Sequence, residues 1–387
     1  MFERSIHPET WRLRNQVIPW ADGLTSDVEH YESAVAYASS DDPLVRQGHE
    51  LVTSLKETYH NKYAGLAELR ILIHLPDPVV SPGGHSVFSN IVNSLKFLGI
   101  ATQHFGDEGV SSDVLERFRP SVLLVSDYMP FIGLINWKHL ASYRAQNRLL
   151  VGLTASLAEY GNSPLGGRLK WAGDHGVDFY FSFRAAKYVA TRMEYAPFAA
   201  AGYRILSIEF GVNPLVYYPV PIGSRNIDYV FLASSNRDKL SRYIEWLTPI
   251  ISESPGVIDG PGWSGVKGFM FNADRDRYVY SRAKVGLNLH LDEQITWANE
   301  LNERTYMLAA CGAPQLVDNP KLLGQYFSAN AFFVASSPKE YVELFREMLV
   351  KPEICTERAL LAQNEVFQRH STFHRVDAFA QELQGML

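Results

Sequence analysis

Two successive series of short apolar runs, each alternating with amphipathic segments, constrain the fold of this 387-residue chain most strongly. Parallel strands covered by helices have this pattern, because both faces of each strand are buried. The first series predicts six strands, at residues 69–75, 100–105, 121–126, 149–153, 178–183 and 204–210. The second predicts five, at 228–233, 256–259, 284–290, 313–318 and 331–335. We therefore predict an α/β protein with two tandem doubly wound, Rossmann-like domains.

A proline- and glycine-rich segment separates the two series. Residues 211–226 contain three prolines and two glycines, a composition typical of a domain boundary. We predict an N-terminal helical extension at 1–66, a first domain at 67–212, a linker at 213–226, a second domain at 227–370 and a terminal helix at 371–387 that packs back on the body. Helical periodicity also predicts helices at 44–59, 237–252, 301–311, 338–349 and 353–369.

The composition narrows the classes of partner. With 36 Lys+Arg against 42 Asp+Glu, the chain has a formal net charge of −6 and offers no overall positive field to nucleic acid. Two cysteines are too few for a disulfide framework and fit a reducing compartment. No signal peptide and no run of roughly 18 apolar residues is evident. We expect a cytoplasmic protein, with any membrane contact peripheral and at the inner face.

The loop after the first predicted strand contains Gly83 and Gly84, directly before a helix. Glycines let the backbone approach a ligand closely, and the first amides of a helix attract anions. The alternative is a plain strand-to-helix turn. His85 begins the same helix and is a candidate catalytic residue, although a lone histidine is more often a cap or a surface residue.

Two other motifs have weaker contexts. Residues 260–265, GPGWSG, match the dinucleotide fingerprint G-x-G-x-x-G, but Pro261 and the following VKGFMFN show no helical period. We interpret this segment as a loop at a strand end that borders a ligand through Gly262 and Trp263. Asp274-Arg275-Asp276 resembles the carboxylate pair of metal-dependent sugar transferases, and we interpret it as a solvated charged face of a helix.

The densest polar cluster follows the predicted strand that ends at His290. A helix is predicted from Leu301 to Cys311, with Gly312 as its left-handed C-cap. A bound diphosphate would gain from the free amides and the dipole of the first turn. The alternative is that the acidic residues there only complement the helix dipole. The residues that crowd this turn are Asn299, Glu300, Asn302, Glu303 and Arg304.

The run NERTYMLAACGAPQLVDNPKLLGQYF (302–327) resembles the C-terminal domain of GT-B glycosyltransferases, particularly the spore-coat-associated (CgeB-like) branch. That branch has the pattern N-x-R-x-F-E-x-x-A-C-G, followed by a strand and an aspartate. Three more segments resemble the family in the expected order: the Gly-Gly loop and first helix at 82–99, the crossover EFGVNPLVYYP at 209–219 and the terminal helix HSTFHRVDAF at 370–379. The resemblance covers residues 69–384.

The resemblance implies that a sugar is transferred from a nucleotide diphosphate donor, held by the C-terminal domain, to an acceptor held mostly by the N-terminal domain. Asn302 and Arg304 match the N-x-R element, and Arg237 and Lys239 resemble the basic pair that contacts the donor diphosphate. The full set expected at the donor is Gly83, Gly84, Arg237, Lys239, Gly262, Trp263, His290, Asn299, Asn302, Glu303 and Arg304. The expected catalytic residues are His85, Asp127 and Glu300.

Two positions depart from the family pattern. The glutamate that usually grips the nucleotide ribose falls on Met307, and its partner eight residues earlier falls on Asn299. Glu300 or Glu303 is expected to substitute from a neighbouring turn. Cations and helix amides can stabilise a departing diphosphate, so we expect no metal and no cofactor. An inverting route needs a general base, for which His85, Asp127 or Glu159 are candidates, whereas a retaining route needs none.

Several alternatives stay open at this stage. A catalytically silent nucleotide- or glycan-binding protein is one, and an epimerase or phosphorylase of the same fold is another. The acceptor is expected to be a glycan or a lipid- or protein-linked glycoconjugate. In the extension, aromatic and basic residues suit either an anionic membrane or a second copy of the chain through residues 1–60. The alternative is that the extension packs on the first domain. These residues are Arg4, Trp11, Arg12, Leu13, Arg14 and Trp20.

Overall fold

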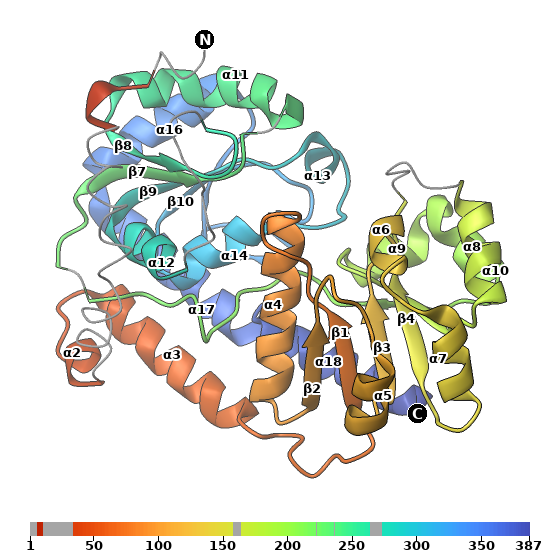
Figure 1. The fold of residues 1–387 in the computed structure, drawn as a ribbon. Helices are drawn as coiled ribbons and strands as arrows, with labels where there is room; N and C mark the ends of the chain where they lie inside the picture. Colours follow the sequence, from red (N-terminus) through yellow and green to blue (C-terminus); the bar gives the residue numbers. More distant parts are fainter. Residues whose placement is uncertain (1–5, 11–33, 158–163, 222, 236, 264–272) are drawn as a thin grey trace. The chain divides into compact units, whose positions relative to one another are not determined.

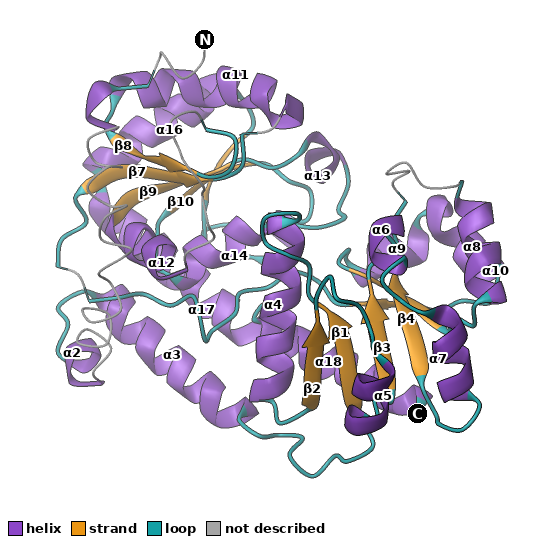
Figure 2. Ribbon diagram, viewed as in Figure 1, coloured by secondary structure: helices purple, strands orange, loops and turns teal. Residues whose placement is uncertain are grey.

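The computed structural model describes residues 6–10, 34–157, 164–221, 223–235, 237–263 and 273–387. They form two compact units, each built on its own parallel sheet (Figures 1 and 2). The six-stranded unit comprises Thr58–Phe210 and Thr372–Leu387. The five-stranded unit comprises Met1–Glu57 and Gly211–Ser371. The prediction of two tandem doubly wound sheets is confirmed.

The sheet of the six-stranded unit has the order β2-β1-β3-β4-β5-β6. The strand order reverses between β1 and β3, so the loops after these strands flank the place where open parallel sheets bind ligands. Each strand coincides with a predicted apolar run to within a few residues. The strands are β1 (Arg70–His74), β2 (Ala101–Phe105), β3 (Val122–Val125), β4 (Leu150–Thr154), β5 (Phe179–Ser182) and β6 (Ile205–Ser207).

Helices cover both faces of this sheet (Figure 2). Phe181 of β5 lies against Phe88 of α4 and Phe379 of α18, with ring centroids 6.4 and 6.2 Å away. Its neighbour Tyr180 points to the other face, where its ring lies 4.8 Å from that of Phe198. The helices are α4 (Pro82–Phe97), α5 (Ser112–Phe118), α6 (Met129–Ile132), α7 (Trp137–Arg144), α8 (Leu165–Asp174), α9 (Ala186–Thr191), α10 (Ala196–Ala200) and α18 (Thr372–Met386), with a 3-10 turn at Met193–Tyr195.

The sheet of the five-stranded unit has the order β11-β10-β9-β7-β8, and its strand order reverses between β7 and β9. Its core joins apolar residues of these strands to the helices that cover them, among them Trp246 and Phe345. The strands are β7 (Ile227–Leu232), β8 (Gly256–Asp259), β9 (Ala283–Asn288), β10 (Gln315–Asp318) and β11 (Phe333–Ala335).

In Figure 1, α11 and α16 lie on one face of this sheet and α12 and α14 on the other. The helices are α2 (Ala34–Ala38), α3 (Pro43–Tyr59), α11 (Arg237–Glu253), α12 (Ala273–Arg282), α13 (Asp292–Thr296), α14 (Glu303–Ala310), α15 (Leu323–Tyr326), α16 (Pro338–Val350) and α17 (Pro352–Arg369). Gly312 has a φ of 70°, as the predicted left-handed cap of α14 requires. The short α13 lies in a stretch that we predicted as a loop.

The described residues of the extension divide between the two units: those up to Glu57 belong to the five-stranded unit, and those from Thr58 on belong to the six-stranded unit. Ile6 belongs to the core of the five-stranded unit, and the His7 amide donates to the Ile251 carbonyl at 2.7 Å. Further along, the Gln47 amide donates to the Leu360 carbonyl at 2.8 Å. The start of α3 is thus bonded to α17, whereas its last residue, Tyr59, packs on Phe373 of α18 with ring centroids 5.7 Å apart. The extension's Arg4, Trp11, Arg12, Leu13, Arg14 and Trp20 lie outside the described residues.

The segment predicted as a linker, 213–226, is an integral part of the five-stranded unit. Tyr217 is buried there, and the Val220 amide donates to Ser281 Oγ at 3.1 Å. Prolines interrupt helical and strand periodicity, but they do not prevent burial. At the other end, α18 joins the six-stranded unit, where Asp377 pairs with Lys62 at 2.7 Å.

Candidate functional site

The carboxyl edge of the five-stranded sheet brings β7, β9 and α14 together at the point of strand reversal. Helix α14 begins at Glu303, and Asn302 is its N-cap: the Asn302 side chain accepts from the Thr305 amide at 3.0 Å. Its other end donates to the Leu289 carbonyl at 3.1 Å. The first turn of α14 is thus fixed to the end of β9, with the amides of that turn at the edge where a ligand is expected.

Arg304 lies half-buried across the end of β7. Its Nε donates to the Leu232 carbonyl at 2.8 Å, and its guanidinium stacks 4.8 Å from the centre of the Phe231 ring. Both contacts hold the cation at the end of β7, beside the first turn of α14. The motif pair Asn302 and Arg304 is therefore brought to a single place by the fold.

The loop after β8 requires its glycines. Gly260 and Gly262 have φ values of 139° and 89°, in the region that side chains rarely adopt. A Cβ at Gly262 would lie 2.6 Å from the Ser235 carbonyl oxygen, so the loop runs directly against the segment after β7. Trp263, expected at the donor, is instead buried in the core, and its Nε1 donates to the Ala233 carbonyl at 2.7 Å.

Basic side chains lie at the start of α11. Lys239 is half-buried, and its Nζ donates to Ser234 Oγ at 3.3 Å. The side chain of Arg237 is not among those that the structure describes, so its predicted contact with the donor diphosphate stays a prediction. Sequence reasoning missed Arg242, one turn further on. Its guanidinium pairs with Asp318 at 2.9 Å and stacks 4.6 Å from the Trp246 ring centre.

His290 is enclosed in a polar network instead of lying open at the surface. Its Nδ1 is 2.7 Å from Asp318 Oδ1, its Nε2 is 3.1 Å from Thr305 Oγ1, and its side chain is 0% exposed. Burial alone would raise the pKa of Asp318, but the charge and hydrogen bonds of His290, with Arg242, lower it below its usual value. Asp318 is therefore a fixed anion, and His290 supports the site from within.

The remaining predicted donor residues divide between the helix and the loop before it. Asn299 and Glu300 precede α14: Asn299 is buried, and the Glu300 carboxylate accepts from Gln294 Nε2 at 2.9 Å. Glu303 is half-buried in the first turn. Met307 is 5% exposed, so it packs into the core one turn below the site. Glu303 is thus the carboxylate on α14 nearest to the usual position.

The interpretation of Asp274-Arg275-Asp276 as a solvated charged face is wrong. Arg275 and Asp276 are buried in α12, where Arg275 bonds Asp259 at 2.8 Å and also Asp276. Burial raises the pKa of the Asp276 carboxyl, although Arg275 opposes that shift. The charges compensate one another inside the unit, which the helical pattern did not reveal. No cluster of three or more metal-ligating side chains occurs among the described residues.

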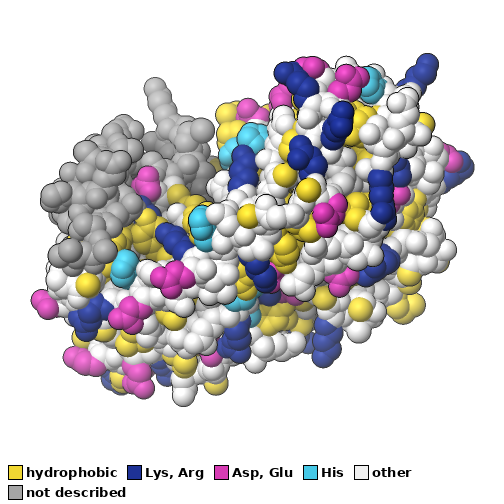
Figure 3. Space-filling model, turned by 90° about the horizontal axis from the view of Figure 1, so that it is seen from below, with side chains coloured by type: hydrophobic (Ala, Val, Ile, Leu, Met, Phe, Trp, Pro, Cys, Tyr) yellow, Lys and Arg dark blue, Asp and Glu magenta, His cyan; other side chains and the backbone are white. Residues whose placement is uncertain are grey.

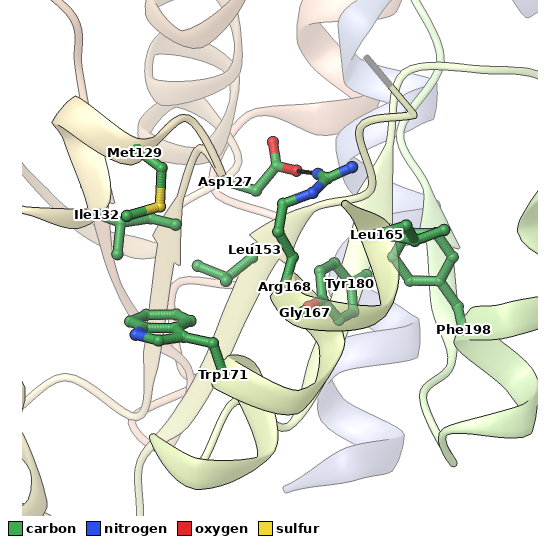
Figure 4. Close-up of a pocket in the computed structure, with 10 residues that line it drawn as sticks. All are labelled: Asp127, Met129, Ile132, Leu153, Leu165, Gly167, Arg168, Trp171, Tyr180 and Phe198. Carbon is green, nitrogen blue, oxygen red and sulfur yellow. Dashed lines mark hydrogen bonds and ion pairs between the residues drawn. The ribbon is translucent and has the colours of Figure 1, made fainter. Parts of the chain in front are cut away.

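In the six-stranded unit, Asp127 lies just after β3, beside the point of strand reversal. Its carboxylate accepts from Thr154 Oγ1 at 2.7 Å and from Arg168 Nη1 at 2.6 Å. Figure 4 shows the two charged groups facing each other at a pocket of about 70 Å³. Burial raises the pKa of Asp127 above its usual value, although Thr154 and Arg168 oppose the shift. The pocket is otherwise mainly apolar: Met129, Ile132, Leu153, Leu165, Gly167, Trp171, Tyr180 and Phe198.

His85, Gly83 and Gly84 lie at the first turns of α4, at the other side of the strand reversal. His85 Nδ1 is 2.8 Å from the Pro76 carbonyl oxygen, which fixes the ring against the loop after β1. A Cβ at Gly83 would meet nothing within 4 Å, whereas one at Gly84 would contact Ser81. His85 lines a hollow of about 430 Å³ that does not include Asp127. Glu159, the third candidate base, lies outside the described residues.

The visible surface in Figure 3 mixes charges of both signs, and no single sign dominates that face. Such a face gives a nucleic-acid backbone no concentrated positive patch. No helix in the described ranges is long and apolar enough to cross a bilayer.

Known proteins resemble this chain in one sequence family and in fold. Residues 242–381 match the family model described as glycosyl transferase-like. T4 phage BGT in complex with its UDP-glucose substrate is 12% identical, with a TM-score of 0.52 over 80% of this chain and 98% of that one. Anabaena HepE in complex with UDP and glucose is 12% identical, with a TM-score of 0.50 over 82% and 100%.

The sucrose-phosphate synthase of Thermosynechococcus elongatus is 11% identical, with a TM-score of 0.50 over 82% of this chain and 99% of that chain. At such identities the likeness establishes the two-domain fold. Among proteins with curated functions, none matches this sequence.

Proposed function

We propose that this chain is a glycosyltransferase of the GT-B fold that moves a sugar from a nucleoside diphosphate to a glycan or a lipid- or protein-linked acceptor. The family match over residues 242–381 and the fold support this proposal. The assignment to the spore-coat-associated branch stays a prediction. T4 phage BGT and Anabaena HepE bind UDP-glucose or UDP, so UDP-glucose is the first donor to test.

The observation that carries the proposal is the junction of Asn302 and Arg304 with the end of β7. The Asn302 cap and the Arg304 contact to Leu232 place helix amides and a cation at one edge. A departing diphosphate gains negative charge, and preorganised amides and cations stabilise that charge without reorganising. We propose that Lys239 and Arg237 add to this positive set and that Glu303 or Glu300 contacts the ribose in place of the family glutamate.

We propose Asp127 as the general base for the acceptor hydroxyl. A base works best when its pKa approaches the operating pH, and burial shifts the pKa of Asp127 in that direction. His85 is kept as a positioning candidate through its contact with the Pro76 carbonyl oxygen. No step of the proposed reaction requires a metal or a cofactor. Residence in the cytoplasm, peripheral membrane contact and self-association through residues 1–60 remain proposals.

The first experiment measures UDP binding by calorimetry. Lys239→Ala should weaken UDP binding roughly tenfold to a hundredfold, the value of a charged hydrogen bond, with little change in stability. Arg304→Lys should weaken it less than Arg304→Ala, because the charge remains but the planar contact is lost. Lys339→Ala, on an 86% exposed side chain in the same unit, is the control and should bind like the wild type. Equal affinity in Lys239→Ala and both Arg304 variants would place the donor elsewhere.

A catalytically silent binding protein is the second candidate, favoured by Met307 and Asn299 at the two positions where the family pattern has the ribose contact. Hydrolysis of UDP-glucose without an added acceptor distinguishes the two. The transferase should release UDP slowly over hours, and Asp127→Asn should abolish that release. Tight UDP binding with no release from a panel of UDP-, GDP- and dTDP-sugars would favour the silent protein.

A further inference from the structure

Six buried or half-buried side chains connect the end of β9 to the first turn of α14 and to β10. They form a continuous hydrogen-bonded network in which the donor–acceptor distances are 3.3 Å or shorter. The network reaches the proposed donor site through Asn302, which caps α14, and through the contact of Asn288 with Arg304. The side chains are Asn288, His290, Asn302, Thr305, Gln315 and Asp318.

Backbone groups of known polarity fix the orientation of the three amides. Asn302 accepts from the Thr305 amide and donates to the Leu289 carbonyl, so its oxygen and nitrogen cannot be exchanged. Gln315 donates to the Thr305 carbonyl at 2.9 Å, which turns its oxygen toward Asn288. Asn288 must then present its nitrogen to Gln315 and its oxygen to Asn302.

The hydroxyl of Thr305 lies where these orientations meet. It has one proton to give and three neighbours: the Asn302 oxygen at 3.1 Å, the Asn288 nitrogen at 2.9 Å and His290 Nε2 at 3.1 Å. The Asn302 oxygen can only accept, so this contact is a hydrogen bond only when the proton of Thr305 points to it, and all three contacts are then bonds only with that proton placed there. Asn288 donates to Thr305. Nε2 of His290 is bonded only if it donates as well, and Nδ1 faces the Asp318 carboxylate, which can only accept.

We propose that His290 is protonated on both ring nitrogens and, through Thr305, holds the Asn302 cap, so that this imidazolium positions the first turn of α14 for the donor diphosphate. The positioning part rests on the proposed function; the protonation part does not. His290 is a positioning residue here, because its enclosed side chain does not reach a ligand itself.

The charges around His290 make this state self-consistent. Asp318 of β10 is the counter-ion of both His290 and Arg242 of α11, so the three groups together carry one positive charge. Tyr341 of α16 faces the network as a neutral phenol that donates to the Leu316 carbonyl. Arg304 of α14 approaches through Asn288 at 3.4 Å, and Asp292 of α13 is 90% exposed beyond Arg242. The surplus charge lies behind a helix N-terminus, where it favours an anion.

The first test measures protonation directly. In the full chain with 15N-labelled histidine, both ring nitrogens of His290 should carry protons at neutral pH, with the signal assigned by its loss in His290→Gln. His370, a buried histidine of the same unit, is the internal reference. A single proton on the His290 ring at pH 7 would overturn the proposal, whatever the protein binds.

The second test separates positioning from packing. Thr305→Val keeps the shape but removes the hydroxyl, and Thr305→Ser restores it. Thr305→Val should weaken UDP binding about fivefold, as the loss of a helix cap does, whereas Thr305→Ser should bind like the wild type. Thr372→Val, which removes a buried hydroxyl bonded to Ser94 in the other unit, is the matched control.

The two tests are judged together. UDP affinity in Thr305→Val equal to that of the wild type would leave His290 and Thr305 only a packing role and overturn the positioning part of the inference. A wild type that binds no nucleoside diphosphate would contradict the proposed function instead, and the protonation result would stand separately.

Discussion

Each unit has a buried aspartate at the carboxyl edge of its sheet, and the two differ in character. Asp127 follows β3 and pairs with Arg168, and Asp318 ends β10 and pairs with Arg242. Yet burial raises the pKa of Asp127, whereas His290 and Arg242 overcome the same effect of burial and lower the pKa of Asp318. Two aspartates at similar positions therefore have pKa values that are shifted in opposite directions.

The number and kind of donors explain this difference. Asp318 receives His290 through both a ring nitrogen and a backbone amide, in addition to Arg242. Asp127 receives one guanidinium, the neutral hydroxyl of Thr154 and backbone hydrogen bonds at Ser156 and Asp127, at a pocket lined mainly by apolar side chains. A carboxylate with surplus positive neighbours is a fixed charge. One held with less compensation can take up a proton during a reaction.

The largest expected effect follows from that contrast. Asp127→Asn should lower the rate of sugar transfer by roughly 10²–10⁴-fold, the usual value of a general base, while UDP affinity stays near that of the wild type. Initial rates of UDP release and calorimetry measure the two quantities. Asp178→Asn, which also breaks an ion pair to an arginine of this unit, is the control and should keep its rate. Normal turnover in Asp127→Asn would remove Asp127 from the reaction.

Stability, unlike the rate of sugar transfer, should depend more on Asp318 than on Asp127. Asp318→Asn leaves Arg242 and His290 without their counter-ion and should destabilise the five-stranded unit by about 3–5 kcal/mol, as the loss of one partner of a buried pair does. Asp127→Asn should cost less, because its raised pKa means that the charged form is disfavoured in the folded state. Hydrogen exchange of peptides from each unit measures the two separately. Equal losses would show that the two carboxylates do not differ.

Gly262 and Gly83, which are both predicted to contact the donor, extend the comparison of the two units to the backbone. Gly262→Ala forces a side chain into a positive φ against the Ser235 carbonyl and should cost roughly 1–3 kcal/mol. Gly83→Ala adds a methyl to α4 with nothing within 4 Å and should stabilise by about 0.5–1 kcal/mol. Thermal unfolding distinguishes them. Unchanged UDP affinity in Gly83→Ala would contradict the prediction that Gly83 contacts the donor.

The smallest expected effect is a loss of stability of the six-stranded unit at acidic pH. His74 is fully buried with neither ring nitrogen hydrogen-bonded, and burial lowers its pKa below the usual 6.5. The unfolded chain therefore binds a proton first, so the six-stranded unit should lose stability as the pH falls below 6.5. His74→Phe, which keeps a ring beside Phe105 and Phe131, should flatten that slope, and His104→Gln, on an exposed side chain, should not. Hydrogen exchange at several pH values measures the slope. A steep slope in His74→Phe would assign the effect to another group.

The sequence predicts the local parts of this molecule well. Apolar runs located the eleven strands of the described residues, because burial on both faces leaves a local composition signal in most of them; the edge strand β2 is partly exposed. The resemblance singled out Asn302 and Arg304, and the structure places them at the cap and in the first turn of α14, which are neighbours in sequence; their function stays a prediction.

What the sequence did not reveal depends on distant neighbours. Arg168 is 41 residues from Asp127, and Arg242 is 76 from Asp318, so no local pattern links either pair. Trp263 and Asp276 have the composition of a ligand loop and a solvated helix, and both are buried by segments far away in sequence. The directions in which the pKa values of Asp127 and Asp318 are shifted follow from such contacts, so the sequence did not predict them either.

The division of the chain has a consequence for how the protein is made. Neither unit is a continuous stretch: one takes residues from both sides of Thr58–Phe210, and the other needs α18, which follows Gly211–Ser371 in the sequence. During synthesis the residues of Thr58–Phe210 emerge without α18, whose Phe373 stacks on Phe97. The face that α18 covers stays open until residues 211–371 of the other unit have been translated. Exchanging domains with another protein by a single cut at 211 would therefore leave both halves incomplete.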